Sequence, residues 1–434
     1  MHLYYCTRAQ GEKQLISLDA PALVTYNMPC TSHAVEEDST SMNDDSTRVS
    51  RRAEQIPPFL VMDVLERAME MACNGNDVIH LEVGEPDFDT PPNIIQAGID
   101  AVRAGRTHYT PSTGIPELRL AIANHYADSY GVEVDPECII VTSGSSPAIF
   151  LALSALLDPG CEAILSDPHY ACYPNFVRFL DGVPVFVEAS PKEGFQVNPD
   201  DVRKAVTNQT RTVLINSPSN PTGIVMEQER MKDLAALGIP LISDEIYHGL
   251  VYEGKEHSVL EFTKNAFVIN GFSKLYAMTG WRLGYVIAPP EFVRPIQKMG
   301  QNFFISASDF VQYAGLEALT NSSEETQKMK ETFNQMRLAM IPRLKEMGFG
   351  IEVDPTAAFY VLADARRFSG DSYRFAFDIL EEARVGVAPG IDFGNNAEGF
   401  IRFSYTNSLE NILAGLDRIE LYLRTRFGPA SRKG

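Results

Sequence analysis

Long apolar stretches, an excess of positive charge and paired cysteines are all missing from this sequence of 434 residues. No apolar run approaches the roughly 20 residues that a membrane-spanning helix needs. Lys and Arg total 37 against 57 Asp and Glu, and the resulting net charge of −20 would repel nucleic-acid phosphates and anionic lipid. The six cysteines never form a C-x-x-C pair, so the ligand spacing of a zinc site is absent. We therefore expect a globular protein without nucleic-acid, membrane or metal partners.

The first 50 residues differ in composition from the rest of the chain. Residues 36–46 are acidic and rich in serine with no hydrophobic period, which is typical of disorder. The segment could also be an interaction tail, or translation could begin at Met28 or Met42. Because no basic stretch followed by an apolar stretch opens the sequence, we expect no secretory signal and a cytoplasmic location.

Short apolar runs alternate with helical stretches beyond about residue 95. Several runs are almost continuously apolar, as expected for strands that are covered on both faces in a parallel sheet. Strands are predicted at 138–142, 163–166, 184–187, 212–215, 240–243, 266–269 and 283–287. Because helices separate many of these strands, the sequence predicts an α/β fold with a large, doubly wound, mostly parallel sheet.

The pattern changes after Pro295. Long amphipathic segments at 324–347 and 409–427 flank a few short strands, one of them at 358–362. This combination indicates a second, smaller α+β domain. The expected division is an extension at 1–50, a segment at 51–94 associated with the small domain, a large domain at 95–300 and a small domain at 301–434.

Polar residues follow the first two predicted strands, where the ligands of an open parallel sheet collect. Gly144, Ser145 and Ser146 precede a helix, and the free N–H groups of a helix N-terminus suit a phosphate. The same residue types also serve as simple helix caps. Tyr170, after the second strand, could stack on a planar ligand or pack at a rim.

Three later strands are followed by a second polar set. Asn220 stands in a rigid Asn-Pro-Thr-Gly turn, where it is either a turn former or a donor to a ligand. Asp244 ends a buried strand, and a buried carboxylate is costly unless an ion pair or a cationic ligand atom compensates it. Lys274 follows the next strand, and Arg282 comes soon after it between two glycines. This arrangement is unlike that of ordinary surface charges.

Three motifs in this order resemble the class I and II aminotransferases, which are fold-type I enzymes dependent on pyridoxal 5′-phosphate. The motifs are Asn220-Pro221-Thr222-Gly223, Asp244-Glu245-Ile246-Tyr247 and Ser273-Lys274 followed by Gly280-Trp281-Arg282-Leu283-Gly284. The resemblance runs from about residue 50 to residue 427. It implies that the amino group of an L-amino acid passes to a 2-oxo acid, with 2-oxoglutarate as the expected acceptor. The mechanism would be ping-pong, through pyridoxamine phosphate.

The resemblance also implies a role for each residue that would contact the cofactor ring. Lys274 would form the Schiff base with the cofactor and then move the proton between Cα and the cofactor. Asp244 would pair with the pyridine nitrogen and keep it protonated. Asn220 and Tyr247 would hydrogen-bond the phenolic oxygen, and Tyr170 would stack on the ring.

The phosphate and the substrate would be held by further matching residues. By resemblance, the phosphate would lie between the Gly144–Ser146 helix start, Ser273 and Arg282, and Tyr109 would reach the phosphate of the neighbouring subunit in a homodimer. For the substrate, Arg402 would bind the α-carboxylate, and the backbone at Gly84 would approach the ligand.

Two departures from the family pattern concern binding. Gly271 stands where many relatives have a phosphate-binding serine, so this contact is expected to be absent. Ser145 and Ser146 stand where some bacterial aspartate aminotransferases have Gly-Lys, which weakens any inference of dicarboxylate specificity. Residues 301–304 could line an apolar pocket or pack the lobes together.

Two alternatives remain at this point. A β-lyase acting on a sulfur amino acid, or another elimination enzyme, would use the same lysine, aspartate and arginine. A cofactor-sensing transcription regulator would carry a basic winged-helix domain before the enzyme-like part, and residues 1–50 are too short and too acidic for one.

Overall fold

The computed structural model of the chain describes residues 49–428. The expectation of disorder concerns residues 1–50 and so lies almost entirely outside the described residues. The chain divides into one unit at 1–56 and another at 57–434. In the first unit the structure describes one short helix, α1 (Arg51–Gln55), which is capped by the Ser50 side chain. The second unit contains all the elements discussed below.

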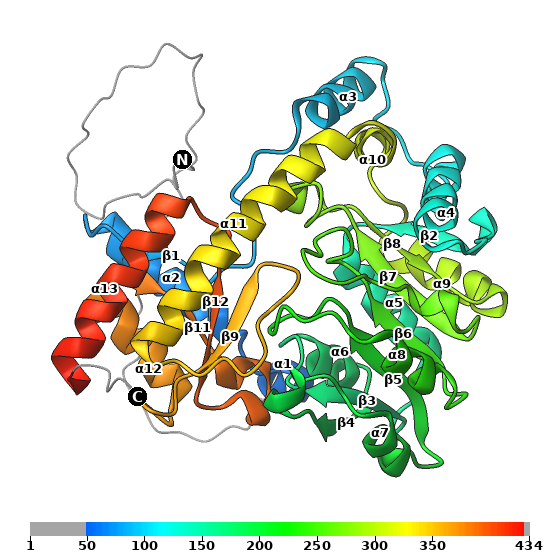
Figure 1. Cartoon of the computed structure of the whole chain (residues 1–434). Coiled ribbons are helices and arrows are strands. Elements are labelled where there is room, and N and C mark those ends of the chain that lie inside the picture. The colour runs from blue at the N-terminus through cyan, green and yellow to red at the C-terminus, as the bar shows by residue number, and fades with distance from the viewer. Residues whose placement is uncertain (1–48, 429–434) are drawn as a thin grey trace, which may run out of the picture. The chain divides into compact units, whose positions relative to one another are not determined.

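A seven-stranded sheet forms the centre of the region between residues 139 and 287 (Figure 1). Its strand order is β2-β8-β7-β6-β5-β3-β4, in which β8 runs antiparallel to both of its neighbours and the other pairs are parallel. The bounds are β2 (Ile139–Thr142), β3 (Glu162–Asp167), β4 (Val183–Glu188), β5 (Thr210–Asn216), β6 (Leu241–Asp244), β7 (Ala266–Gly271) and β8 (Gly284–Ile287). All seven strands predicted from the sequence are therefore confirmed, and so is the mostly parallel α/β fold.

Helices cover both faces of this sheet, which explains the continuous apolar runs. In β5, Val213 and Ile215 belong to the apolar core on one face, and Leu214 belongs to the core on the other. Side chains alternate along a strand, so a strand buried on both faces must be apolar at every position. The helices between residues 92 and 321 are α3 (Pro92–Arg103), α4 (Pro116–Tyr130), α5 (Ser145–Leu156), α6 (Tyr173–Phe179), α7 (Pro199–Ala205), α8 (Gln228–Ala235), α9 (Pro290–Phe303) and α10 (Asp309–Asn321).

A second, antiparallel sheet lies in the C-terminal part of the chain, with the order β11-β12-β9. These strands are β9 (Tyr360–Asp364), β11 (Ala388–Pro389) and β12 (Phe400–Ser404), and a separate parallel pair joins β1 (Ile79–His80) to β10 (Val385–Gly386). The accompanying helices are α2 (Leu60–Cys73), α11 (Ser323–Met347), α12 (Ser372–Asp378) and α13 (Leu409–Phe427). The amphipathic segments predicted at 324–347 and 409–427 are thus confirmed as α11 and α13. Although it comes early in the chain, α2 contacts β10 and β11.

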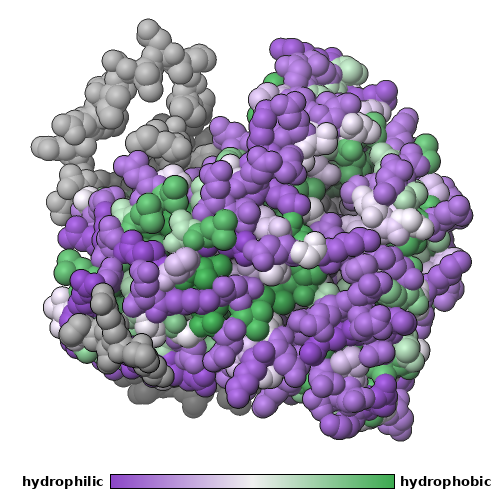
Figure 2. All heavy atoms as spheres, in the orientation of Figure 1, coloured by the Kyte–Doolittle hydropathy of each residue, from purple (hydrophilic) through white to green (hydrophobic). Residues whose placement is uncertain are grey.

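The surface seen in Figure 2 is mostly hydrophilic, and apolar residues gather near the middle of this face. No helix within residues 49–428 combines the length and the apolar character that crossing a membrane requires.

Candidate active site

A cavity of about 330 Å³ is lined by residues from the carboxyl ends of β5 and β6, from the loop after β7, and from β9 and β12. It brings together most of the site residues that the sequence predicts. They are Gly84, Ser145, Ser146, Tyr170, Asn220, Asp244, Tyr247, Ser273, Lys274, Arg282 and Arg402. Seven chain segments that are far apart in sequence therefore converge on one space next to the carboxyl edge of the large sheet, where ligands of such folds bind.

Lys274 presents its ammonium group to this cavity. Its Nζ donates a hydrogen bond to the carbonyl oxygen of Gly84 at 2.7 Å. Burial, together with the charges of Arg402 and Arg282, lowers the pKa of Lys274 to about 8, against the opposing effect of Glu85. A lysine with this pKa is partly neutral near pH 7, which is what a nucleophilic amine needs.

Asp244 is the last residue of β6, and its side chain is only 5% exposed. Its Oδ2 accepts a 2.6 Å hydrogen bond from the hydroxyl of Tyr173, and its Oδ1 accepts one from the backbone N–H of Ile246 at 3.2 Å. Burial raises the pKa of Asp244 to about 6, against the hydrogen bonds that favour the charged form. Within residues 49–428, no Lys, Arg or His forms an ion pair with this carboxylate, so it remains available to a cationic ligand atom.

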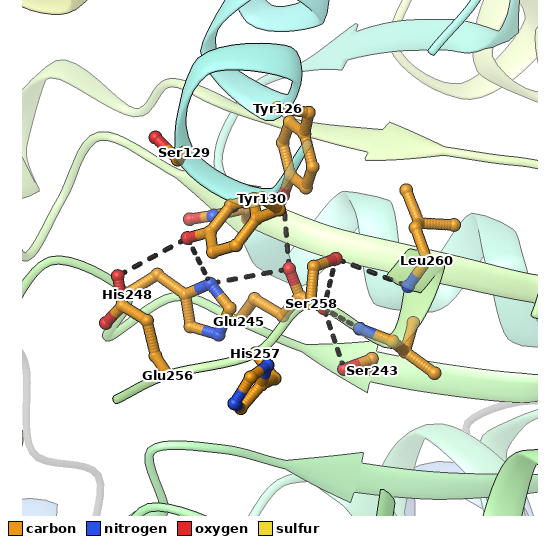
Figure 3. Close-up of polar contacts among 12 residues, drawn as sticks. Tyr126, Ser129, Tyr130, Ser243, Glu245, His248, Glu256, His257, Ser258 and Leu260 are labelled. Atoms are coloured by element: carbon orange, nitrogen blue, oxygen red, sulfur yellow. Dashed lines mark hydrogen bonds and ion pairs between the residues drawn. The ribbon is translucent and has the colours of Figure 1, made fainter. Parts of the chain in front are cut away.

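Glu245, the next residue, is fully buried and accepts hydrogen bonds from a network behind the cavity (Figure 3). Its oxygens accept from the Tyr126 hydroxyl at 3.2 Å, the Ser258 hydroxyl at 3.0 Å and the backbone N–H of Val259 at 3.0 Å. The Nδ1 atom of His248 lies 3.5 Å from its Oε2. In the described part of the chain no Lys or Arg pairs with Glu245, so these donors and His248 stabilise its charge.

The same network ties α4 to the turn that follows β6. In Figure 3, Tyr126 and Tyr130 extend from α4 towards Glu245 and His248, and the Tyr130 hydroxyl lies 2.7 Å from Nδ1 of His248. Glu256 also contributes, because its Oε2 accepts the backbone N–H of Gly249 at 2.9 Å. The turn begins directly after Asp244, so its anchoring helps to fix the position of that carboxylate.

Gly144 and Arg282 form a cradle at the start of α5. Gly144 is the N-cap residue with φ of 101°, a conformation that favours glycine. A Cβ at this position would lie 2.6 Å from the Nη2 atom of Arg282, so a side chain would fill the cradle. A helix N-terminus beside a guanidinium is a strong site for an anion. Gly144 does not itself line the cavity, whereas Ser145 and Ser146 do.

The glycine at position 271, where many relatives have a phosphate-binding serine, has a steric reason. A Cβ on Gly271 would lie 2.9 Å from the carbonyl oxygen of Leu283 and 3.1 Å from the Cα of Gly284. Both are backbone atoms, so a serine would displace the β7–β8 pairing.

Arg402 lies on β12 and is 2% exposed. Its Nη1 donates to Oδ1 of Asn220 at 3.0 Å, and its Nη2 donates to the carbonyl oxygen of Glu82. The guanidinium carbon lies 4.5 Å from the ring centre of Tyr360 and 4.7 Å from that of Phe393. Its Nε is buried without a hydrogen-bond partner. Two aromatic rings and two hydrogen bonds therefore position the guanidinium, and its Nε is left without a partner.

Tyr247 and Asn220 complete the polar side of the cavity. The Tyr247 hydroxyl lies 2.9 Å from the Tyr360 hydroxyl, and burial raises the pKa of Tyr247 above its usual range. Because Arg402 engages Oδ1 of Asn220, the amide nitrogen is the atom that can donate to a ligand.

Several lining residues were not predicted from the sequence. Tyr173 and Tyr360 contact predicted site residues directly, and the start of α2 contributes Phe59 and Met62. The available signal for Tyr173 was a second tyrosine shortly after Tyr170; Tyr360 gave none beyond its place in a predicted strand.

Tyr109 lies apart from the other predicted site residues. It is 82% exposed and does not line the cavity of its own chain. Its contribution to a second subunit remains a prediction.

Comparisons with known proteins now decide the family. The family model described as "Aminotransferase class I and II" matches residues 76–419. The chain belongs to this family. It is 44% identical to the (5-formylfuran-3-yl)methyl phosphate transaminase of Methanocaldococcus jannaschii, over 86% of this chain and 99% of the relative. It is 39% identical to the aspartate/prephenate aminotransferase of Thermus thermophilus, over 85% of this chain and 97% of the relative.

Solved structures support the same family for this chain. The Thermus thermophilus aspartate aminotransferase with maleate matches with a TM-score of 0.83 at 39% identity, over 86% of this chain and 99% of that one. A Methanococcus jannaschii protein, described as similar in its active site to kynurenine aminotransferases, matches with a TM-score of 0.81 at 43% identity, over 87% and 100%. These relatives confirm fold type I, and none of those named here is a lyase.

Proposed function

We propose that this aminotransferase works with pyridoxal 5′-phosphate in the cavity at the end of β6, with Lys274 as the attachment residue. The family generally depends on this cofactor. The observation that carries the proposal is a lysine with a pKa of about 8 that shares one cavity with a buried carboxylate, Asp244, which forms no ion pair with a Lys, Arg or His among residues 49–428. The Gly144–Arg282 cradle supplies a matching anion site for a phosphate.

When bound, the cofactor would supply an aldehyde that takes up amino groups and a ring that accepts electrons released at the substrate Cα. Lys274 would hold the aldehyde carbon through Nζ and, once displaced, would move the proton from Cα with the same atom. Asp244 would hold a proton on the ring nitrogen, because a buried carboxylate is stabilised by an adjacent cation. Asn220 and Tyr247 would donate hydrogen bonds to the ring oxygen.

The remaining residues would orient the two ends of the complex. Ser145, Ser146, Ser273 and Arg282 would hold the phosphate, and Tyr170 would cover one face of the ring. Arg402 would bind the α-carboxylate of the amino acid and then that of the 2-oxo acid, since donor and acceptor occupy one site in turn. Gly84 would form the opposite wall through its backbone.

We propose further that the enzyme is a homodimer in which Tyr109 completes the phosphate site of the neighbouring subunit. Tyr109 projects from a loop that is anchored directly after it in the sequence. Gln312 donates to the Thr110 hydroxyl at 3.0 Å, and Gln297 donates to the Ser112 hydroxyl at 3.0 Å. An exposed tyrosine on a rigid loop can reach another chain at little entropic cost. We also propose that the chain forms a large domain at 95–300 and a small domain at 301–434, and that the protein is cytoplasmic.

Borohydride trapping tests the proposed function. The purified protein is incubated with pyridoxal 5′-phosphate, reduced and digested, and the labelled peptide is identified by mass spectrometry. We expect the label on Lys274, and a label elsewhere or none would overturn the proposal. In the unreduced enzyme, an amino acid should change the absorbance spectrum and a 2-oxo acid should restore it. Release of pyruvate and ammonia without a 2-oxo acid would instead indicate a lyase.

A further inference from the structure

We infer that the substrate side chain is uncharged and apolar or aromatic, and that Phe59, Val61 and Met62 form the wall that binds it. This inference rests on the proposed function, because it takes Arg402 as the site of the α-carboxylate. It departs from the acceptor that the family resemblance implies, 2-oxoglutarate, which is a dicarboxylate.

The first argument concerns the cations of the cavity. Among the described residues that line it, the cationic side chains are Lys274, Arg282 and Arg402. Each already has a proposed partner in the cofactor or in the α-carboxylate. A second carboxylate on the substrate would therefore find no free cation among the described residues that its own protomer contributes to the cavity, and a desolvated, unpaired carboxylate is costly.

The second argument concerns the wall itself, which joins the two ends of the proposed site. Phe59 makes an edge-on contact with Tyr170, with ring centres 6.1 Å apart. Val61 packs in one apolar cluster with Phe393, whose ring lies 4.7 Å from the guanidinium carbon of Arg402. The start of α2 thus spans from the proposed ring-stacking tyrosine to the proposed carboxylate-binding arginine, where a substrate side chain would emerge.

The third argument concerns charge at the start of α2. Its first N–H groups, those of Leu60 and Val61, donate to Oδ1 and Oδ2 of Asp392 at 3.1 and 3.0 Å. The helix N-terminus, which would otherwise attract an anion, is therefore already occupied by a carboxylate. Glu85 adds another negative charge to the cavity lining. A dicarboxylate would meet repulsion here, whereas a phenyl or aliphatic group would bury apolar surface.

Binding of unreactive acids to the cofactor-loaded enzyme tests this inference without turnover. Isothermal titration calorimetry compares 3-phenylpropionate with maleate, which carry one and two carboxylates. We expect 3-phenylpropionate to bind at least about tenfold more tightly. Equal or tighter binding of maleate would overturn the inference, and would be the result if a second protomer supplied the missing cation.

A gain-of-function variant provides the second arm. Met62 is 42% exposed, so a longer polar side chain there is compatible with folding. We expect Met62→Lys to reduce the preference for 3-phenylpropionate by about tenfold, because it adds a cation to the wall. Met62→Gln is the uncharged control, and Leu421→Lys adds the same charge at a 68% exposed position on α13 outside the cavity lining. A change of the same size in either control would contradict the inference.

The proposed function and this inference can fail separately. If 3-phenylpropionate binds preferentially but neither phenylalanine nor leucine changes the cofactor spectrum, the wall is as described and the proposed function fails. If aspartate and glutamate react faster than phenylalanine and leucine, the proposed function stands and the inference is overturned.

Discussion

The hydroxyl of Tyr173 donates a 2.6 Å hydrogen bond to Oδ2 of Asp244 in a region where both side chains are buried. Tyr173 begins α6 and Asp244 ends β6, so the bond joins two elements at the carboxyl edge of the sheet. A hydrogen bond donated to a carboxylate favours its ionised form. Two such bonds, from Tyr173 and from the backbone of Ile246, lower the pKa of Asp244 against the effect of burial, and the bond from Tyr173 has the larger effect.

We therefore predict that Tyr173→Phe raises the pKa of Asp244 and weakens cofactor binding. The loss should be about tenfold near pH 6.5, where more of the carboxyl becomes protonated, and smaller at pH 8.5. Absorbance titration of the apoenzyme at both pH values measures it. Tyr373→Phe, which alters an exposed tyrosine of α12, is the control. Equal losses at both pH values would mean that Tyr173 acts through packing alone.

A second prediction concerns the rate of cofactor attachment to the apoenzyme. Only the neutral amine attacks an aldehyde, and the pKa of Lys274 is about 8. The neutral fraction is then about one tenth at pH 7 and about nine tenths at pH 9. Stopped-flow absorbance should show the attachment rate rising through this range and levelling above it. Lys274→Ala should give no attachment yet retain its circular-dichroism spectrum, whereas Lys264→Ala, on an exposed side chain, should behave as wild type.

A third prediction concerns the stability of the apoenzyme. Burial raises the pKa of Asp244 from 3.8 to about 6, so between these values the folded state binds more protons than the unfolded state. Its contribution to stability is therefore full below pH 3.8 and falls as pH rises to about 6. Asp244→Asn removes this penalty, which is of the order of 3 kcal/mol. Denaturant unfolding should show the variant more stable than wild type at pH 7.5, with the difference shrinking towards pH 4.

The same variant should bind the cofactor poorly, because it has no charge to hold a proton on the ring nitrogen. Greater stability together with lost binding is the expected trade-off at a site built for a ligand. An apoenzyme that becomes less stable at pH 7.5 on this substitution would show that the charge is already compensated within the protein.

A fourth prediction tests the contribution of Tyr109 across subunits. Lys274→Ala and Tyr109→Ala chains are each expected to be impaired as pure dimers. After the two are mixed, denatured and refolded together, a mixed dimer holds one site with an intact lysine and an intact neighbouring tyrosine. Activity above the sum of the separate variants is expected. If Tyr109 acted within its own chain, mixing would restore nothing.

The strands and the central residues of the site were predictable because each depends on local sequence. Burial on both faces requires continuous apolar runs such as Val213–Ile215, and these locate strands directly. Asp244 and Lys274 follow such runs, so their place at the carboxyl edge follows from the fold. The spacing of the surrounding motifs then identifies the family.

The partners of these residues were not predictable, because they come from distant segments. Tyr173 lies in the first turn of a short helix, and its pairing with Asp244 depends on the packing of α6 against the sheet. Tyr360 lies in a strand whose pattern does not show which face meets Tyr247. The contribution of Met62 likewise depends on where α2 packs, which no local pattern of the sequence determines.

The contacts of Arg402 have a consequence for biosynthesis. Its guanidinium contacts Asn220 and the backbone of Glu82, which precede Arg402 by 182 and 320 residues along the chain. A nascent polypeptide that has already completed the large sheet therefore still lacks Arg402, the residue proposed to bind the substrate α-carboxylate. If Arg402 binds the amino acid as proposed, a product terminated before residue 402 would be incapable of transamination even if its sheet had folded.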